Sequence, residues 1–97
     1  MQLLPAEHAL KQFIALNPWH GSYHGRLAGV LHSRGNTTDA IAAAERGLEF
    51  NPHLWRLHEF LADLYTNIGD HKSAERHQNL LRRMRAADPP DQSGGQR

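Results

Sequence analysis

Residues 17–52 have the sequence NPWHGSYHGRLAGVLHSRGNTTDAIAAAERGLEFNP, which contains one complete unit of a repeat. The unit runs between two Asn-Pro pairs, whose prolines Pro18 and Pro52 lie 34 residues apart. Other residues recur at the same spacing, in the pairs Gly35 and Gly69, Ala40 and Ala74, His24 and His58, Leu27 and Leu61, and Ala28 and Ala62. A fixed period of this length, with two helical patterns around a glycine turn, predicts an array of helical repeats rather than a closed globular core.

Two amphipathic helices are predicted within this unit. The first carries apolar residues at Tyr23, Leu27, Val30 and Leu31 and ends at the turn Arg34-Gly35-Asn36, where glycine supplies the left-handed backbone conformation. Thr37 or Thr38 is predicted to cap the second helix, whose stripe is Ile41, Ala44 and Leu48.

The next unit, residues 53–87, repeats this plan. Its first helix ends at Asn67-Ile68-Gly69, and Asp70 is predicted to cap the last helix. The period then fails, because Ala86 stands where a proline is expected and the last helix is extended. Residues 88–97 are polar and contain Pro89-Pro90 and Gly94-Gly95, so we predict a disordered tail.

Residues 1–18 are predicted to be the second helix of a partial repeat. Ala6, Ile14 and Pro18 fall one period before Ala40, Leu48 and Pro52. The helix that would cover the apolar stripe of residues 1–18 is missing from the sequence, so we expect part of that stripe to be exposed. The candidates for self-association on it are Leu10, Phe13 and Ile14.

Composition excludes several classes of function. Eleven Lys and Arg balance ten Asp and Glu, a formal charge of +1 that lacks the basic excess of nucleic-acid binders. The chain has no cysteine for a disulfide, a thiolate nucleophile or a zinc site of cysteines, and no apolar run approaches a membrane span. We therefore expect no nucleic-acid and no membrane partner; the cellular location stays open.

In its period of 34 residues, its glycine turns and its small residues, the sequence resembles the tetratricopeptide repeat (TPR) family over about residues 6–86. Agreement with the family pattern is found at Leu27, Ala28, Leu31, Ala40 and Pro52, and again at Leu61, Ala62, Tyr65 and Ala74. Departures from it are His24, Ala44 and Gly47, then His58, Gln78, Leu81 and Ala86. The resemblance implies an all-α fold of about five antiparallel helices in a short right-handed α-solenoid, with residues 1–18, 19–52 and 53–87 as its repeat units.

By the same resemblance, the chain is a non-catalytic module of a larger protein that binds a peptide or a partner helix in a concave groove. The family's groove positions correspond here to Ser22, Gly25, Gly29, His32 and Ser33, and to Arg56, Glu59, Asp63, Thr66 and Asn67. The subfamily that clamps peptide carboxylates needs Lys and Asn where Gly25 and Gly29 stand, so that specificity is not expected. The alternative is a homo-oligomerisation module that docks or swaps its unpaired N-terminal helix, giving a homodimer.

Four other patterns have a chemical and a structural interpretation. His20 and His24, four residues apart, could bind a metal, and Glu59 and Asp63 could act as acid and base. The arginines at 76, 82, 83 and 85 could contact phosphates, while Trp19 and Trp55 could anchor an interface. The histidine pair lacks a third metal ligand, the carboxylate pair lacks a catalytic partner, and the arginines lack interleaved aromatic residues. Packing and solvation therefore explain these three patterns. We predict no catalytic residue, no metal and no cofactor.

Overall fold

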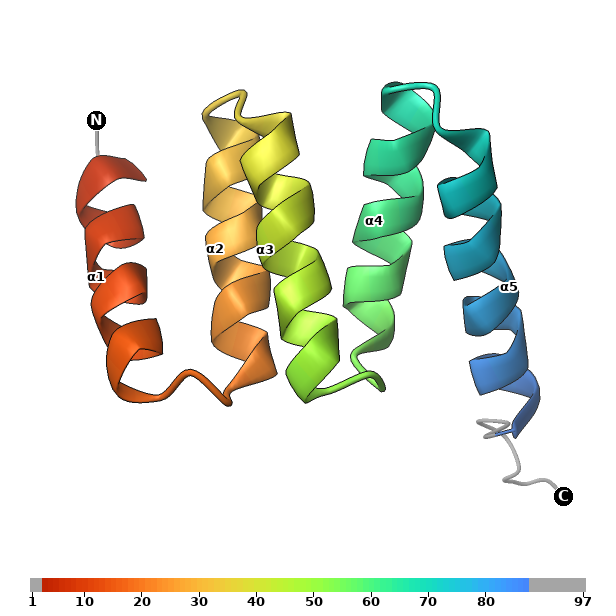
Figure 1. Ribbon diagram of the computed structural model, residues 1–97, viewed down its shortest axis with the longest axis horizontal. Helices are drawn as coiled ribbons and strands as arrows, with labels where there is room; N and C mark the ends of the chain where they lie inside the picture. Colours follow the sequence, from red (N-terminus) through yellow and green to blue (C-terminus); the bar gives the residue numbers. More distant parts are fainter. Residues whose placement is uncertain (1–2, 88–97) are drawn as a thin grey trace, which may run out of the picture. The chain divides into compact units, whose positions relative to one another are not determined.

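The computed structural model describes residues 3–87, all of whose regular elements are α-helices (Figure 1). Their bounds are α1 Leu3–Leu16, α2 Gly21–Ser33, α3 Thr37–Phe50, α4 Trp55–Asn67 and α5 His71–Ala87. The predicted all-α class and the five helices are confirmed. The predicted disordered tail, residues 88–97, lies outside the described residues.

The chain divides into two compact units. Unit 1 is residues 1–57 and unit 2 is residues 58–97, so the division falls after the first residues of α4. Unit 1 contains α1, α2, α3 and the start of α4, and unit 2 contains the rest of α4 and α5.

Glycine ends the first helix of each repeat, as predicted. Gly35 has φ +83° and Gly69 has φ +85°, which is the left-handed conformation that glycine adopts without a steric penalty. The Asn36 amide donates to the Leu31 carbonyl oxygen at 2.9 Å, which closes the turn between α2 and α3. The prediction of a threonine cap is wrong: Asn36 precedes α3, and its side chain makes no cap hydrogen bond.

Small residues let α2 and α3 pack closely. Ala28 on α2 and Ala40 and Ala44 on α3 are completely buried. At the other end of the pair, a Cβ built on Gly47 would lie 2.8 Å from the Gly21 carbonyl oxygen. Since real Cβ atoms do not come that near to an oxygen, this crossing requires glycine.

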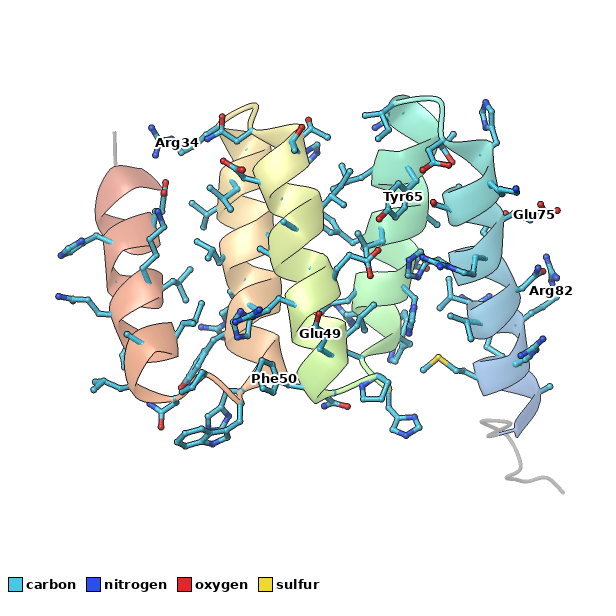
Figure 2. All side chains as sticks on the ribbon, in the orientation of Figure 1. Arg34, Glu49, Phe50, Tyr65, Glu75 and Arg82 are labelled. Carbon is cyan, nitrogen blue, oxygen red and sulfur yellow. The ribbon has the colours of Figure 1, made fainter. Side chains whose placement is uncertain are left out.

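α1 packs against α2 through one face. Leu10 and Ile14 are half-buried there, and the Phe13 ring stacks on Tyr23 with 5.5 Å between ring centroids. Glu7 is buried on the same side, where it forms ion pairs with Arg34 and with Lys11, the latter at 2.9 Å. Figure 2 shows Arg34 extending from the end of α2 towards α1. Of the three self-association candidates, Leu10 and Ile14 are therefore half-buried and Phe13 is exposed, so only part of the apolar stripe is open, as expected.

The Glu7 ion pairs predict a pH dependence of this contact. Hydrogen bonds from Lys11 and Arg34 lower the pKa of Glu7 below its ordinary value. Their stabilisation is therefore present at neutral pH and is lost as the pH falls through the lowered pKa. We expect the hydrogen-exchange protection of α1 amides to fall on acidification, and to lose this dependence in Glu7→Gln. The exposed Glu49→Gln is the control; equal behaviour of the two variants would contradict the assignment.

Unit 2 is built on two fully buried leucines and a pair of histidines. Leu61 and Leu64 of α4 are the largest fully buried side chains. His58 and His77 are also buried, and their Nδ1 atoms lie 2.9 Å apart, so one ring donates and the other accepts. The Tyr65 ring stacks on His77 at 5.8 Å.

The predicted cap of α5 is confirmed. The Ser73 amide donates to Asp70 Oδ1 at 3.2 Å, and the Ser73 hydroxyl donates to Asp70 Oδ2 at 2.8 Å. These hydrogen bonds lower the pKa of Asp70. Asp70 therefore satisfies a backbone donor of the first turn of α5, which is the role of a helix N-cap.

Candidate partner-binding surfaces

The groove candidates of unit 1 share one face of α2. Ser22, Ser33 and His32 are exposed, while Gly25 and Gly29 are half-buried. Their spacing places them on the face beside the buried one, which is formed by Gly21, His24, Ala28 and Leu31. The Ser33 hydroxyl donates to the Gly29 carbonyl oxygen at 3.1 Å, so one of these polar groups is used by the helix itself.

The two glycines on this face have different surroundings. A Cβ at Gly25 would lie 2.9 Å from Leu57 Cδ2, so Gly25 serves the packing of unit 1. A Cβ at Gly29 would meet nothing within 4 Å. Glycine inside a helix lowers stability by about 0.5–1 kcal/mol relative to alanine. At Gly25, the close packing of Leu57 accounts for a glycine in spite of this loss of stability. At Gly29 no neighbouring atom requires a glycine, and the surface above the helix is open.

The remaining groove candidates lie on exposed positions of α4. Arg56, in unit 1, places its guanidinium 5.1 Å from the centre of the Trp55 ring. In unit 2, Glu59, Asp63, Thr66 and Asn67 share one exposed face. Glu59 lies 3.8 Å from Arg85, and the Thr66 hydroxyl donates to the Ala62 carbonyl oxygen at 2.8 Å. Asp63 is then the carboxylate of this face with no side-chain partner among the described residues.

A second apolar surface lies on α1. Phe13 is 49% exposed and Leu16 is 73% exposed, and Ala9 is exposed one turn before Phe13. The spacing of four and then three residues places all three on one stripe. Of the three self-association candidates, only Phe13 belongs to this stripe. Ala9 and Leu16 were not among the self-association candidates, although their spacing from Phe13 places them on its side of the helix.

Both tryptophans are largely exposed. Trp19 is 58% exposed in the turn between α1 and α2, and Trp55 is 46% exposed at the start of α4. His20 bridges Trp19 to Tyr23, with ring centroids 6.2 Å and 5.2 Å away. The stack on Tyr23 continues to Phe13, so aromatic rings run from the end of α1 to the first turn of α2.

The two histidines that sequence spacing paired do not converge. His24 is buried, its Nε2 lies 2.9 Å from the Pro18 carbonyl oxygen, and its ring stacks on Phe50 at 5.5 Å. His20 is exposed beside Trp19. Within residues 3–87, no group of three or more His, Asp or Glu side chains is arranged to hold a metal ion. His24 is instead the packing ring at a position where the TPR pattern has an aromatic residue.

The arginines of α5 lie mainly on its solvent side. Arg76 and Arg83 share an exposed face with Lys72, and Arg82 bonds Asn79 Oδ1 at 2.6 Å. Figure 2 shows Glu75 and Arg82 on the side of α5 away from α4. No described helix is both long and apolar enough to cross a membrane.

Comparison with solved structures identifies the fold. The chain is similar to a crystal structure of MamA with 22% sequence identity and a TM-score of 0.87, over 92% of this chain and 52% of that chain. A second crystal structure of MamA shares 21% identity and a TM-score of 0.83, over 99% of this chain and 52% of that one. A structure of a MamA mutant shares 24% identity and a TM-score of 0.70, over 77% of this chain and 55% of that chain.

MamA is a TPR-like helical repeat protein, so the predicted repeat fold is confirmed. At these identities the similarity concerns the fold alone. The chain spans about half the length of the solved chains that it matches. No family model matches the chain, and no curated protein matches it in sequence.

Proposed function

We propose that this chain is a non-catalytic protein-binding module that takes up a peptide or a partner helix on the exposed face of α2 or on that of α4. The TPR-like fold supports the general class, a protein-interaction repeat module. The observation that carries the proposal is Gly29, an interior helical glycine that no packing contact requires. Open backbone at this position lets a ligand segment approach α2 closely.

The chemistry of the two faces limits the ligand. The α2 face has no charged side chain among its groove candidates, whereas the α4 face carries Glu59 and the unpaired Asp63. Small or flat groups of a ligand suit the α2 face at Gly29, and the α4 face, taken by itself, suits a basic or amide side chain at Asp63.

A selection experiment tests this proposal. The full chain is used to select peptides of about 12 residues from a random library, a length that spans about three helical turns or a strand. Affinities of the enriched peptides are then measured by fluorescence anisotropy. We expect Gly29→Leu to weaken binding at least about tenfold, because its side chain would occupy the open surface. The matched control is Ala42→Leu, an exposed position on α3. Failure to enrich any peptide that distinguishes Gly29→Leu from the control would refute the proposal.

A second candidate function is self-association through α1. It is favoured by the exposure of Phe13 and Leu16, large apolar side chains that a monomer leaves in water. Its general test is the mass of the chain in solution as a function of concentration.

A further inference from the structure

We infer that α5 carries a second partner-binding surface, a basic face that takes up an acidic segment of another protein. The face is formed by four exposed cations on one side of the helix and a polar residue between them: Lys72, Arg76, Arg82, Arg83 and Asn79. It is distinct from the peptide site proposed for α2 or α4, because it lies on another helix and suits a negatively charged ligand. Three observations support it: the charge of α5, the chemistry of a recess on its surface and the residues found one period earlier.

The charge of α5 is the largest of the five described helices. His71–Ala87 contains five Lys and Arg residues and one acidic residue, a formal charge of +4. α3, which stands one period earlier, contains three acidic residues and one arginine, a formal charge of −2. Arg85 lies 3.8 Å from Glu59, whereas the four cations of the basic face form no ion pair within the described residues. These four charges are therefore available to a ligand.

A shallow recess opens on the basic face near the C-terminal end of α5. It is lined by Asn79, Arg82, Arg83 and Ala86. Arg82 donates to Asn79 Oδ1 at 2.6 Å, which leaves the NH2 group of Asn79 for a ligand. The polar groups that face a ligand here are therefore N–H donors, namely two guanidinium groups and one amide. Such a set suits a carboxylate, which accepts hydrogen bonds on both oxygens and which arginine binds in a bidentate manner.

The repeat fold does not explain all of these cations. None of the four positions one period earlier holds a Lys or an Arg; they are Thr38, Ala42, Leu48 and Glu49. The helix dipole favours Arg82 and Arg83, which lie in the last two turns of α5. It disfavours Lys72, because the first turn of a helix favours acidic residues, and α5 has none there. A ligand that reaches from Arg83 to Lys72 accounts for cations at both ends of the face.

Nearby carboxylates restrict the ligand further. Glu75 is exposed, and Figure 2 shows it on the same side of α5 as Arg82. The hydrogen bonds from Ser73 lower the pKa of Asp70, and the charge of Arg76 adds to this effect. A ligand therefore places its carboxylates at the two ends of the basic face, and a neutral or basic side chain at Glu75.

A protein segment fits this pattern better than a nucleic acid or an anionic membrane. Those two present anionic groups without interruption, so they would meet Glu75, and they favour a basic excess that the chain, at +1, lacks. α5 also has no Phe, Tyr or Trp on which a base could stack. From Lys72 to Arg83 the helix rises about 16 Å, which about 11 residues of helix or about five of extended chain span. The carboxylates of such a segment can be spaced around Glu75.

The first test measures binding of a labelled peptide of about 15 residues, glutamate and serine in equal parts, which covers the face in either conformation. Fluorescence anisotropy with the full chain gives the dissociation constant. We expect the wild type to bind and Arg83→Glu to raise the constant at least about fivefold. Arg46→Glu is the matched control, since Arg46 is exposed on α3 and the change in net charge is identical. No binding by the wild type, or equal losses in the two variants, would overturn the inference.

A second test uses the direction of the effect at Glu75. Glu75→Gln removes the carboxylate beside the basic face and should lower the dissociation constant of the same peptide at least about twofold. Glu49→Gln, an equal change of charge at an exposed position of α3, should leave the constant unchanged. Circular dichroism verifies that every variant is folded. If Glu49→Gln strengthened binding as much as Glu75→Gln, the peptide would respond to net charge alone, and the basic face would not be its site.

Two further ligands separate this surface from its alternatives. The first is a mixed-sequence single-stranded oligonucleotide of about 15 nucleotides. If it bound more tightly than the acidic peptide, with the same loss in Arg83→Glu, the assignment of an acidic protein partner would be overturned. The second is a selected peptide whose binding depends on Gly29, which should bind Arg83→Glu as it binds the wild type. A loss of that binding would show that the two surfaces are not distinct and would overturn the inference.

Discussion

Replacing Gly47 by alanine is expected to lower the free energy of unfolding by about 1–3 kcal/mol, although the substitution raises helix propensity. The new Cβ would lie 2.8 Å from the Gly21 carbonyl oxygen and 2.9 Å from Leu57 Cδ1. Leu57 can rotate, but the oxygen belongs to the backbone of α2 and cannot move without shifting that helix. α2 and α3 must therefore separate, which loosens the contact of Ala28 with its buried neighbours.

The same substitution at Gly29 provides the control. Gly29 has no neighbour within 4 Å of the position its Cβ would take, so only the helix propensity changes. We expect Gly29→Ala to raise the free energy of unfolding by about 0.5–1 kcal/mol. Urea denaturation followed by circular dichroism measures both variants. A Gly47→Ala variant as stable as Gly29→Ala would show that α2 and α3 are not in backbone contact.

Replacing His24 by alanine is expected to cost about 2–4 kcal/mol, the largest effect of any histidine substitution in unit 1. The substitution removes the ring that stacks on Phe50 at 5.5 Å and leaves the Pro18 carbonyl oxygen without its donor. His24→Phe retains a flat ring but not the donor, so we expect a smaller loss of about 1 kcal/mol.

The exposed His8 on α1 is the reference for these variants. His8→Ala should change the free energy of unfolding by no more than about 0.5 kcal/mol, as is usual for surface substitutions. Thermal and urea unfolding of the three variants give the ranking. If His24→Phe proved as damaging as His24→Ala, the loss would come from the hydrogen bond to Pro18 and not from the ring stack on Phe50.

The helices and turns could be predicted from the sequence because their causes are local. A glycine in the left-handed region and an Asp cap act within a few residues, so Gly35, Gly69 and Asp70 identify the helix ends directly. The threonine cap failed for the same local reason: Asn36 preceded both threonines and could occupy the position between the turn and α3.

The orientation of α1 could not be predicted in this way. Leu10, Phe13 and Ile14 all fit an amphipathic stripe, and the periodicity does not say which part of a wide stripe meets a neighbour. The structure resolves this through Glu7, whose ion pair with Arg34 crosses 27 residues of sequence and directs one side of α1 to α2. An ion pair between residues so far apart leaves no periodic signal in the sequence. The side of α1 that remains exposed, with Ala9 and Leu16, depends on this ion pair and could not be predicted either.

The short turn between α2 and α3 has a kinetic consequence. The two helices are joined through Arg34, Gly35 and Asn36, and the contacts between them connect residues near in sequence. Closing so short a loop costs little chain entropy, and proteins dominated by local contacts fold in microseconds to milliseconds. The hairpin of α2 and α3 is therefore suited to form early in synthesis. Its early formation shortens the time for which the apolar faces of the two helices are exposed to other chains.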